Sequence, residues 1–316
     1  MKKSLLISTA LTLGIGASML MPVEQARADD CLLDRDNDGN VDGGSTDNDG
    51  GANSNDSDAS TACGVGASAT GSFASAFGSS SDASGDRTTA IGRLSDATAD
   101  DATAVGHFAR ATAVDSTALG QAADASASNA VALGQAAVAD FVDAVAIGQS
   151  ADVGGLAAIA MGADANADGA NAISVGARSL AQSGSVAIGG YGGDLGTLGA
   201  QASGVDSTAV GADSEASATE ASAFGNAARA TGDDSTALGV DTLASGTRST
   251  AVGNRASASG TDSVALGNLA NADFAGSIAI GSRADVGGID TVAIGTDATA
   301  GAAEAIAMGT FASAGG

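Results

Sequence analysis

The chain has 316 residues and a formal net charge of −25. So acidic a chain repels nucleic acid and anionic lipid, and we expect neither as a partner. It holds 47 glycines, no tryptophan and one proline, Pro22. Such a composition lacks the large apolar and aromatic side chains that fill the core of an enzyme of this size, so we expect a closely packed, non-enzymatic fold.

Residues 1–28 have the pattern of a secretory signal peptide. Lys2 and Lys3 give a positive start, residues 5–21 form an apolar stretch, and residues 26–28 read Ala-Arg-Ala, a typical cleavage site. The mature chain is therefore expected to begin at Asp29. Since no later segment reaches the ~20 apolar residues of a spanning helix, we expect no transmembrane segment in the mature chain. The predicted location is extracellular, either secreted or on the surface of a bacterium.

Residues 29–60 are rich in Asp, Gly, Asn and Ser and contain a candidate calcium loop. Alternate carboxylates followed by a glycine can converge on one hard cation. The loop has a serine, Ser45, where an EF-hand carries its bidentate glutamate, and it is more similar to a thrombospondin type 3 calcium repeat. The alternative is a disordered acidic linker. The candidate ligands are Asp34, Asp36, Asp38, Asp42, Asp47 and Asp49.

The two cysteines, Cys31 and Cys63, both remain in the mature chain. Outside the cell they can form one disulfide. Cys63 has an alternative role as an apolar core residue, because it stands at an apolar position of the repeat described next.

Residues 61–316 form a tandem repeat whose unit ends in a small residue, alanine, an apolar residue and glycine. The repeat has a constant 14-residue period except at two consecutive steps, and it comprises 18 units. Positions below are counted from the motif glycine. Position −2 is alanine in every unit except at Ser174, and position −1 is always apolar or Cys63. The motif glycines are Gly64, Gly78, Gly92, Gly106, Gly120, Gly134, Gly148, Gly162, Gly176, Gly189, Gly211, Gly225, Gly239, Gly253, Gly267, Gly281, Gly295 and Gly309.

This alternation over positions −3 to −1 predicts a short strand in each unit. Positions −3 and −1 carry the larger side chains, so we expect that face to be the core. Alternating small residues after the glycine, such as Ala256 and Ala258, predict a second short strand. One 14-residue unit is then one coil of a parallel β-solenoid, all-β and of about 18 coils. Each coil buries so little bulk that we expect association with further chains.

The repeat region contains further candidate sites. An insertion at 190–204 contains the only tyrosine, Tyr191, and is expected to be either a binding loop or a passive hinge. Position −5 is often acidic, and these side chains either bind cations between coils or simply face water. The acidic residues at −5 are Asp101, Asp115, Asp143, Asp206, Asp234, Asp262, Asp290, Glu220 and Glu304. His107 is the only histidine, too few for a catalytic triad or a zinc site.

The repeats resemble the head repeats of YadA-like trimeric autotransporter adhesins. Residues 263–267 read Ser-Val-Ala-Leu-Gly, and residues 185–189 and 277–281 both read Ser-(Val/Ile)-Ala-Ile-Gly. The resemblance runs from about Thr61 to the end of the sequence. It implies a left-handed parallel β-roll, assembly into a homotrimer, and binding to an extracellular matrix or cell-surface protein. The neck, coiled-coil stalk and β-barrel anchor of the family are not recognisable, which predicts a secreted head or a truncated reading frame.

The expected function is therefore an exported, non-enzymatic, adhesin-like head that displays a repetitive surface. The alternative is a monomeric structural or interfacial solenoid, such as an ice-binding or surface-coat protein. That alternative draws on hydroxyl residues at −3 and −4, which would form ladders on one flat face. A degradative enzyme built on a β-helix is a third reading, and no distinctive pair of acids favours it.

Overall fold

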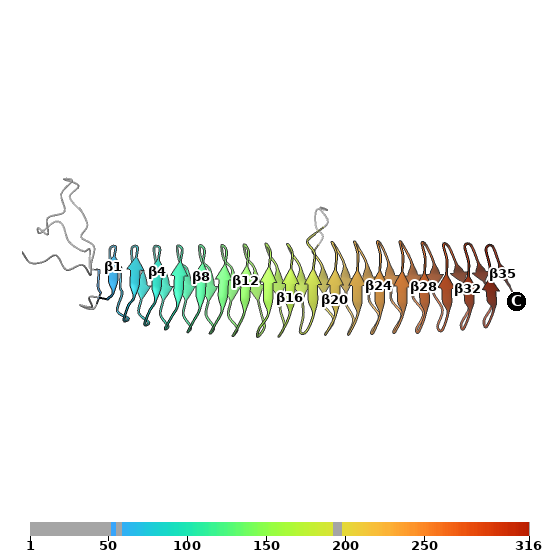
Figure 1. Cartoon of the computed structure of the whole chain (residues 1–316), viewed down its shortest axis with the longest axis horizontal. Coiled ribbons are helices and arrows are strands. Elements are labelled where there is room, and N and C mark those ends of the chain that lie inside the picture. The colour runs from blue at the N-terminus through green and yellow to red at the C-terminus, as the bar shows by residue number, and fades with distance from the viewer. Residues whose placement is uncertain (1–51, 55–58, 192–197, 316) are drawn as a thin grey trace, which may run out of the picture.

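The computed structural model describes residues 52–54, 59–191 and 198–315. In this part the chain winds into an elongated parallel β-solenoid without helices (Figure 1). One sheet contains 18 strands of three residues, and a second stack contains shorter strands of two residues. The predicted all-β solenoid and its number of coils are thus confirmed.

The long strands cover positions −3 to −1 of each unit. They are β1 (Thr61–Cys63), β2 (Ser75–Phe77), β4 (Thr89–Ile91), β6 (Thr103–Val105), β8 (Thr117–Leu119), β10 (Val131–Leu133), β12 (Val145–Ile147), β14 (Ile159–Met161), β16 (Ile173–Val175), β18 (Val186–Ile188), β20 (Thr208–Val210), β22 (Ser222–Phe224), β24 (Thr236–Leu238), β26 (Thr250–Val252), β28 (Val264–Leu266), β30 (Ile278–Ile280), β32 (Val292–Ile294) and β34 (Ile306–Met308).

The short strands cover positions +4 and +5 in the regular coils. They are β3 (Asp82–Ala83), β5 (Asp96–Ala97), β7 (Arg110–Ala111), β9 (Asp124–Ala125), β11 (Val138–Ala139), β13 (Asp152–Val153), β15 (Asn166–Ala167), β17 (Leu180–Ala181), β19 (Gln201–Ala202), β21 (Glu215–Ala216), β23 (Arg229–Ala230), β25 (Leu243–Ala244), β27 (Ser257–Ala258), β29 (Asn271–Ala272), β31 (Asp285–Val286), β33 (Thr299–Ala300) and β35 (Ser313–Ala314).

Each strand pairs in parallel with the equivalent strand one coil later. Thr103 of β6 lies opposite Thr117 of β8, and Val131 of β10 lies opposite Val145 of β12. The same register continues across the irregular region, where Val186 of β18 lies opposite Thr208 of β20. Every repeat position therefore forms a column of like residues along the solenoid.

The interior of the solenoid is made of small side chains, which corrects the predicted core. The alanines at −2, such as Ala118 and Ala237, and those on the inner side of the short strands, such as Ala258, are fully buried. Positions −3 and −1 point outward and are only partly covered. The reason is the width of the coil: two strands joined by tight turns leave room for alanine or serine, and the larger side chains fit only outside.

Backbone contact between coils explains why the motif residue is glycine. Gly134 has φ 140°, a conformation that side chains with a Cβ rarely adopt. A Cβ on Gly134 would lie 2.6 Å from the carbonyl carbon of Gly148 in the next coil. The motif glycine therefore meets two demands, an unusual φ and direct backbone stacking.

Hydroxyl groups at −4 satisfy the backbone inside the corners. The Ser116 Oγ donates to the carbonyl oxygen of Ala113 at 2.6 Å, and the Thr88 Oγ1 donates to that of Gly85 at 2.7 Å. Since −4 shares its face with −2, these hydroxyls are buried. The two-row hydroxyl surface considered for an interfacial protein therefore does not form, because the −4 row lies inside.

Candidate interaction surfaces

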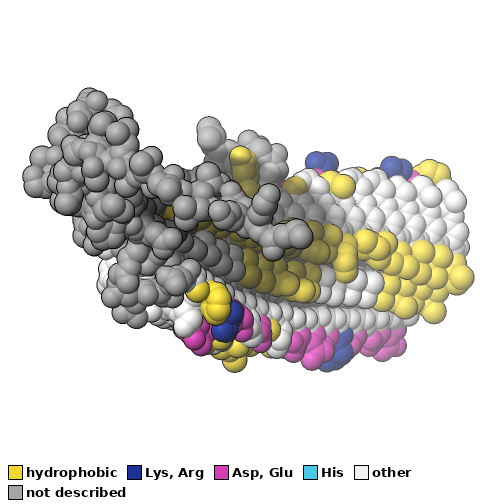
Figure 2. All heavy atoms as spheres, turned by 60° about the vertical axis from the view of Figure 1, so that its left-hand side comes forward, with side chains coloured by type: hydrophobic (Ala, Val, Ile, Leu, Met, Phe, Trp, Pro, Cys, Tyr) yellow, Lys and Arg dark blue, Asp and Glu magenta, His cyan; other side chains and the backbone are white. Residues whose placement is uncertain are grey.

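The outward face of the long strands, here called the apolar face, comprises positions −3 and −1 of β1 to β34. Leu238 in β24 is 47% exposed and Phe77 in β2 is 40% exposed. Figure 2 shows hydrophobic side chains gathered in a strip along the solenoid, with acidic and arginine side chains along an edge. Soluble monomers rarely expose a long continuous apolar surface, so a strip of this kind is typical of an interaction site.

The corner before each long strand, positions −6 and −5, carries much of the charge. Asp101 and Asp115 occupy −5 with φ 59° and 58°. Asp and Asn tolerate this left-handed conformation better than most residues do, because their short polar side chains bond locally. The backbone thus gives a structural reason for acids at −5 that requires no ligand.

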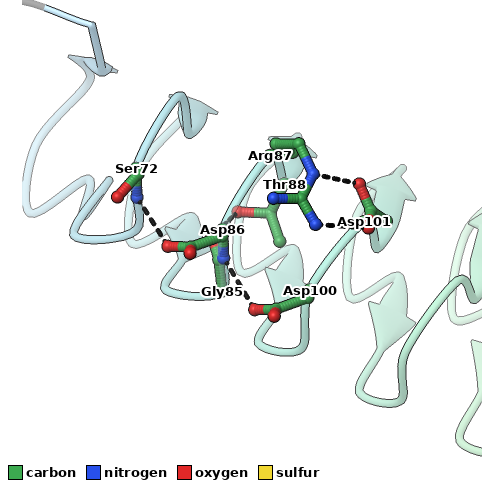
Figure 3. Close-up of polar contacts among 7 residues, drawn as sticks. All are labelled: Ser72, Gly85, Asp86, Arg87, Thr88, Asp100 and Asp101. Atoms are coloured by element: carbon green, nitrogen blue, oxygen red, sulfur yellow. Dashed lines mark hydrogen bonds and ion pairs between the residues drawn. The ribbon is translucent and has the colours of Figure 1, made fainter.

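Arginines relieve part of the repulsion between stacked acids. The Arg87 guanidinium donates to both carboxylate oxygens of Asp101, each at 2.6 Å (Figure 3). One position earlier, the Asp86 N–H donates to the Asp100 carboxylate at 3.0 Å, and the Ser72 N–H donates to Asp86 at 3.0 Å. The hydrogen bond from Arg87 holds the pKa of Asp101 below its usual range. Each contact joins equivalent positions of one coil and the next.

The outer row of the short strands holds further acids, among them Asp96 and Asp152. Burial raises the pKa of Asp96, and the neighbouring carboxylate of Asp82 raises it further. The pKa of Asp152 is raised in the same way, first by burial and then by Asp140 and Asp168. Across 52–54, 59–191 and 198–315, no group of three or more acidic, His or Cys side chains is arranged to hold a metal ion.

The insertion leaves the solenoid between β18 and β19, and its described ends lie against neighbouring coils. The Arg178 guanidinium lies 5.6 Å from the ring centre of Tyr191. Leu198 is 59% exposed and contributes to two shallow hollows, of about 380 and 430 Å³. The first hollow is also lined by Asp164, Asn166, Arg178, Ser179, Leu180 and Gln201. Both hollows are open to solvent.

Several predicted site residues lie outside the described residues. They are the signal peptide, the calcium-loop candidates Asp34, Asp36, Asp38, Asp42, Asp47 and Asp49, and Cys31. Cys63 lies on the outward side of β1 and is only partly buried, so its interpretation as a core residue is wrong. Its pairing with Cys31 stays a prediction. The Nε2 of His107 lies 2.9 Å from the Nη1 of Arg93, and its ring packs beside that of Phe108.

The contacts between equivalent positions are what the sequence reasoning missed. An arginine followed one repeat unit later by an acid, as in Arg87 and Asp101 or Arg248 and Asp262, is visible once the units are aligned in columns. The same alignment shows that −4 contains only Ala, Ser and Thr. That column shares a face with −2, and its small size marks the inside of the coil.

Comparison with known proteins identifies the repeat. A family model for the YadA head domain repeat, spanning two copies, matches residues 69–95, 83–109, 97–123, 125–151, 154–179, 202–228, 230–256, 258–284 and 287–312. Together these segments cover more than half of the chain. The chain belongs to the YadA head repeat family. No curated protein sequence matches it.

Each match to the YadA head repeat spans about two consecutive 14-residue units of the solenoid. The matched segments include both the long strands with their apolar face and the corners with their charges. No helix capable of crossing a membrane occurs among the residues that the structure describes.

Proposed function

We propose that the chain is an adhesin-like head, assembled from three copies and displayed outside a bacterial cell. The observation that carries the proposal is the apolar face. It continues over 18 stacked strands, which at ~4.8 Å per strand is on the order of 85 Å. A solenoid with an alanine interior keeps its larger apolar residues on the outside, and three copies can cover these faces against one another.

In such an assembly the corners and the short strands remain outside. They carry acids and arginines at a fixed spacing along the rod, as with Arg87 and Asp101 at one corner. A rigid, repetitive, charged surface suits attachment to an extracellular matrix or a cell-surface protein, because many weak contacts act together. A catalytic role has less support, since the two hollows beside the insertion are shallow and open.

The proposal is tested with beads coated with the chain from residue 29 onward. Retention is measured on reconstituted basement-membrane matrix and on cultured epithelial cells, against beads coated with albumin and beads coated with the heat-denatured chain. We expect saturable retention by the folded chain that both controls lack. Retention no higher than that of albumin beads on both surfaces would reject an adhesive role.

The interfacial alternative has a separate readout. Ice-binding proteins produce a gap between the freezing and melting temperatures of a solution. With the −4 hydroxyls buried, only one row of threonines remains on each apolar face, and that row is interrupted by aliphatic residues. We expect no thermal hysteresis from the purified chain, and a measurable gap would favour the alternative.

Export and calcium binding belong to the same proposal and rest on sequence patterns alone. The signal peptide supports export with a mature terminus at Asp29. The alternating aspartates beginning at Asp34 support a calcium loop. Mass determination of the secreted chain tests the first, since a chain that retains residues 1–28 would contradict it.

A further inference from the structure

The apolar face is not uniform along the solenoid, because position −3 changes character in blocks. Position −1 is apolar or Cys63 in all coils. Position −3 is hydroxyl-bearing from β1 to β8, aliphatic from β10 to β18, hydroxyl-bearing from β20 to β26 and aliphatic from β28 to β34. The hydroxyl bands are Thr61, Ser75, Thr89, Thr103 and Thr117, then Thr208, Ser222, Thr236 and Thr250. The aliphatic bands are Val131, Val145, Ile159, Ile173 and Val186, then Val264, Ile278, Val292 and Ile306.

These bands form continuous columns in space. Thr103 and Thr117 are paired neighbours within the first hydroxyl band. At its boundary Thr117 is paired with Val131, and the next such boundary pairs Val186 with Thr208. The side chains at −3 point outward and are half-buried by their neighbours in the column, except Ile306 in the last coil, which is 63% exposed. A partner lying on the apolar face therefore meets alternating zones of hydroxyl and aliphatic groups.

A uniform repeat creates a problem of register between copies. Within one chain, connectivity decides which coil follows which. Between chains, a slip of one coil moves each apolar −1 residue opposite another apolar residue and loses contact only at the ends. Register is weakly specified wherever a pattern repeats without variation.

The bands remove this degeneracy. When the copies are aligned, each hydroxyl band of one copy lies opposite the same band of the next copy. The hydroxyls can then hydrogen-bond to one another or to shared water. A slip of one coil brings threonine against aliphatic residues at each of the boundaries Thr117–Val131, Val186–Thr208 and Thr250–Val264. Those hydroxyls then lose water without gaining a partner, which is unfavourable.

We propose that the alternating bands at position −3 set the axial register in which copies of this chain assemble. The inference rests on the proposed function, since it takes a second copy of the chain as the occupant of the apolar face. It adds that the threonines on this face contact the partner copies. Their positions along the solenoid determine which coils of two copies lie opposite each other, in addition to favouring strand formation.

The test compares three forms of the chain from residue 29 onward. In the band-erased variant, all residues of both hydroxyl bands are replaced by valine. In the matched control, every threonine of both bands is replaced by serine, which keeps a hydroxyl in every coil of the bands. Valine has nearly the shape of threonine and already occupies −3 in β10, β12, β18, β28 and β32. Circular dichroism checks that each variant folds.

A photo-crosslinking amino acid at Leu238 reports the register. Mixing isotope-labelled and unlabelled chains identifies the crosslinks between copies by mass spectrometry. In the wild type and the serine control we expect crosslinks confined to β24 and its immediate neighbours. In the band-erased variant we expect additional crosslinks displaced by whole repeat units.

The outcomes separate the two proposals. A single register in the band-erased variant, or mixed registers in the wild type, overturns the inference while leaving the assembly intact. Sedimentation of the same samples reports the number of chains. Monomers without crosslinks between copies would overturn both the assembly and its register.

Discussion

Arg248 binds Asp262 one coil further along the solenoid through two hydrogen bonds, from Nε to Oδ1 at 2.6 Å and from Nη2 to Oδ2 at 2.7 Å. Both residues occupy position −5, with φ 55° and 59°. The geometry repeats in Arg87 and Asp101. A rise of one strand spacing per coil thus matches the reach of a guanidinium to a carboxylate in the same column.

The ion pair between Arg248 and Asp262 predicts a change in the titration of Asp262 when the arginine is replaced. The hydrogen bond from Arg248, and then its charge, lower the pKa of Asp262 from the ordinary 3.8. A lowered pKa in the folded state stabilises the fold above the unfolded pKa, and that contribution is lost as pH falls through the folded pKa. Both side chains are exposed, so we expect only a small effect on stability. The Arg248→Gln variant should raise the pKa of Asp262 in a carboxylate NMR titration.

Arg255→Gln is the matched control for this titration. Arg255 faces Asp241 at 3.6 Å and does not contact Asp262 through an ion pair in the described structure. We expect it to leave the titration of Asp262 unchanged. If both variants shift Asp262 equally, a general change in charge is responsible and the specific pair is not.

Stacked glycine backbones make a prediction about stability. Gly134→Ala and Gly309→Ala both place a Cβ on a residue with positive φ, 140° and 122°, which costs roughly 1–3 kcal/mol. A Cβ at Gly134 also lies 2.6 Å from a backbone carbon of Gly148, whereas at Gly309 nothing lies within 4 Å. We expect Gly134→Ala to lower the free energy of unfolding by about 1–3 kcal/mol more.

Urea unfolding followed by circular dichroism measures this difference. Because repeat proteins can unfold in parts, local hydrogen exchange around each site should accompany the global curve. Equal destabilisation by the two substitutions would show that φ strain alone explains the glycine, and that the contact between coils does not.

Two buried serines at −4 give a second stability comparison. Ser116 donates to the carbonyl oxygen of Ala113 at 2.6 Å, whereas the Oγ of Ser249 is buried without a hydrogen-bond partner. Removing a satisfied hydroxyl typically costs about 0.5–1.5 kcal/mol, while removing an unsatisfied one is neutral or favourable. Ser116→Ala should therefore destabilise the solenoid, and Ser249→Ala should leave it unchanged or more stable in the same urea assay.

Calcium binding is predicted for the acidic segment that precedes the solenoid. Isothermal titration of calcium into the chain from residue 29 onward should give a heat that is lost when Asp34, Asp36 and Asp38 are all replaced by asparagine. Carboxylates are the preferred ligands of calcium, and their amides lack the charge. Replacing Asp233 and Asp234, two acids in the solenoid, by asparagine is the control. If the triple variant binds calcium as the wild type does, these three aspartates are not the calcium ligands.

The sequence was sufficient to predict the repeat period, the strands and the stacking of equivalent residues in successive coils. These follow from the 14-residue period of the columns, since a coil of that length has room for two short strands and turns. The size of the side chains at −3 and −1 did not predict correctly which face of the long strand lies inside. Alternation defines two faces, and the distance across the coil selects between them.

That distance depends on how closely the turns fold back, and in the sequence only the small residues at −4 and −2 reflect it. Fully buried Ala118 and half-exposed Leu119 are adjacent in β8, and the bulkier one lies outside. The usual rule that the larger apolar residue is buried fails for a single chain of this width. It is restored if the covering is supplied by other copies of the same chain.

Sedimentation equilibrium on the purified chain from residue 29 onward therefore tests the central claim most directly. The apolar face of one solenoid is proposed to be covered by two further copies. The predicted result is a single species with three times the mass of one chain across micromolar concentrations. A species with the mass of one chain over that range would contradict the account.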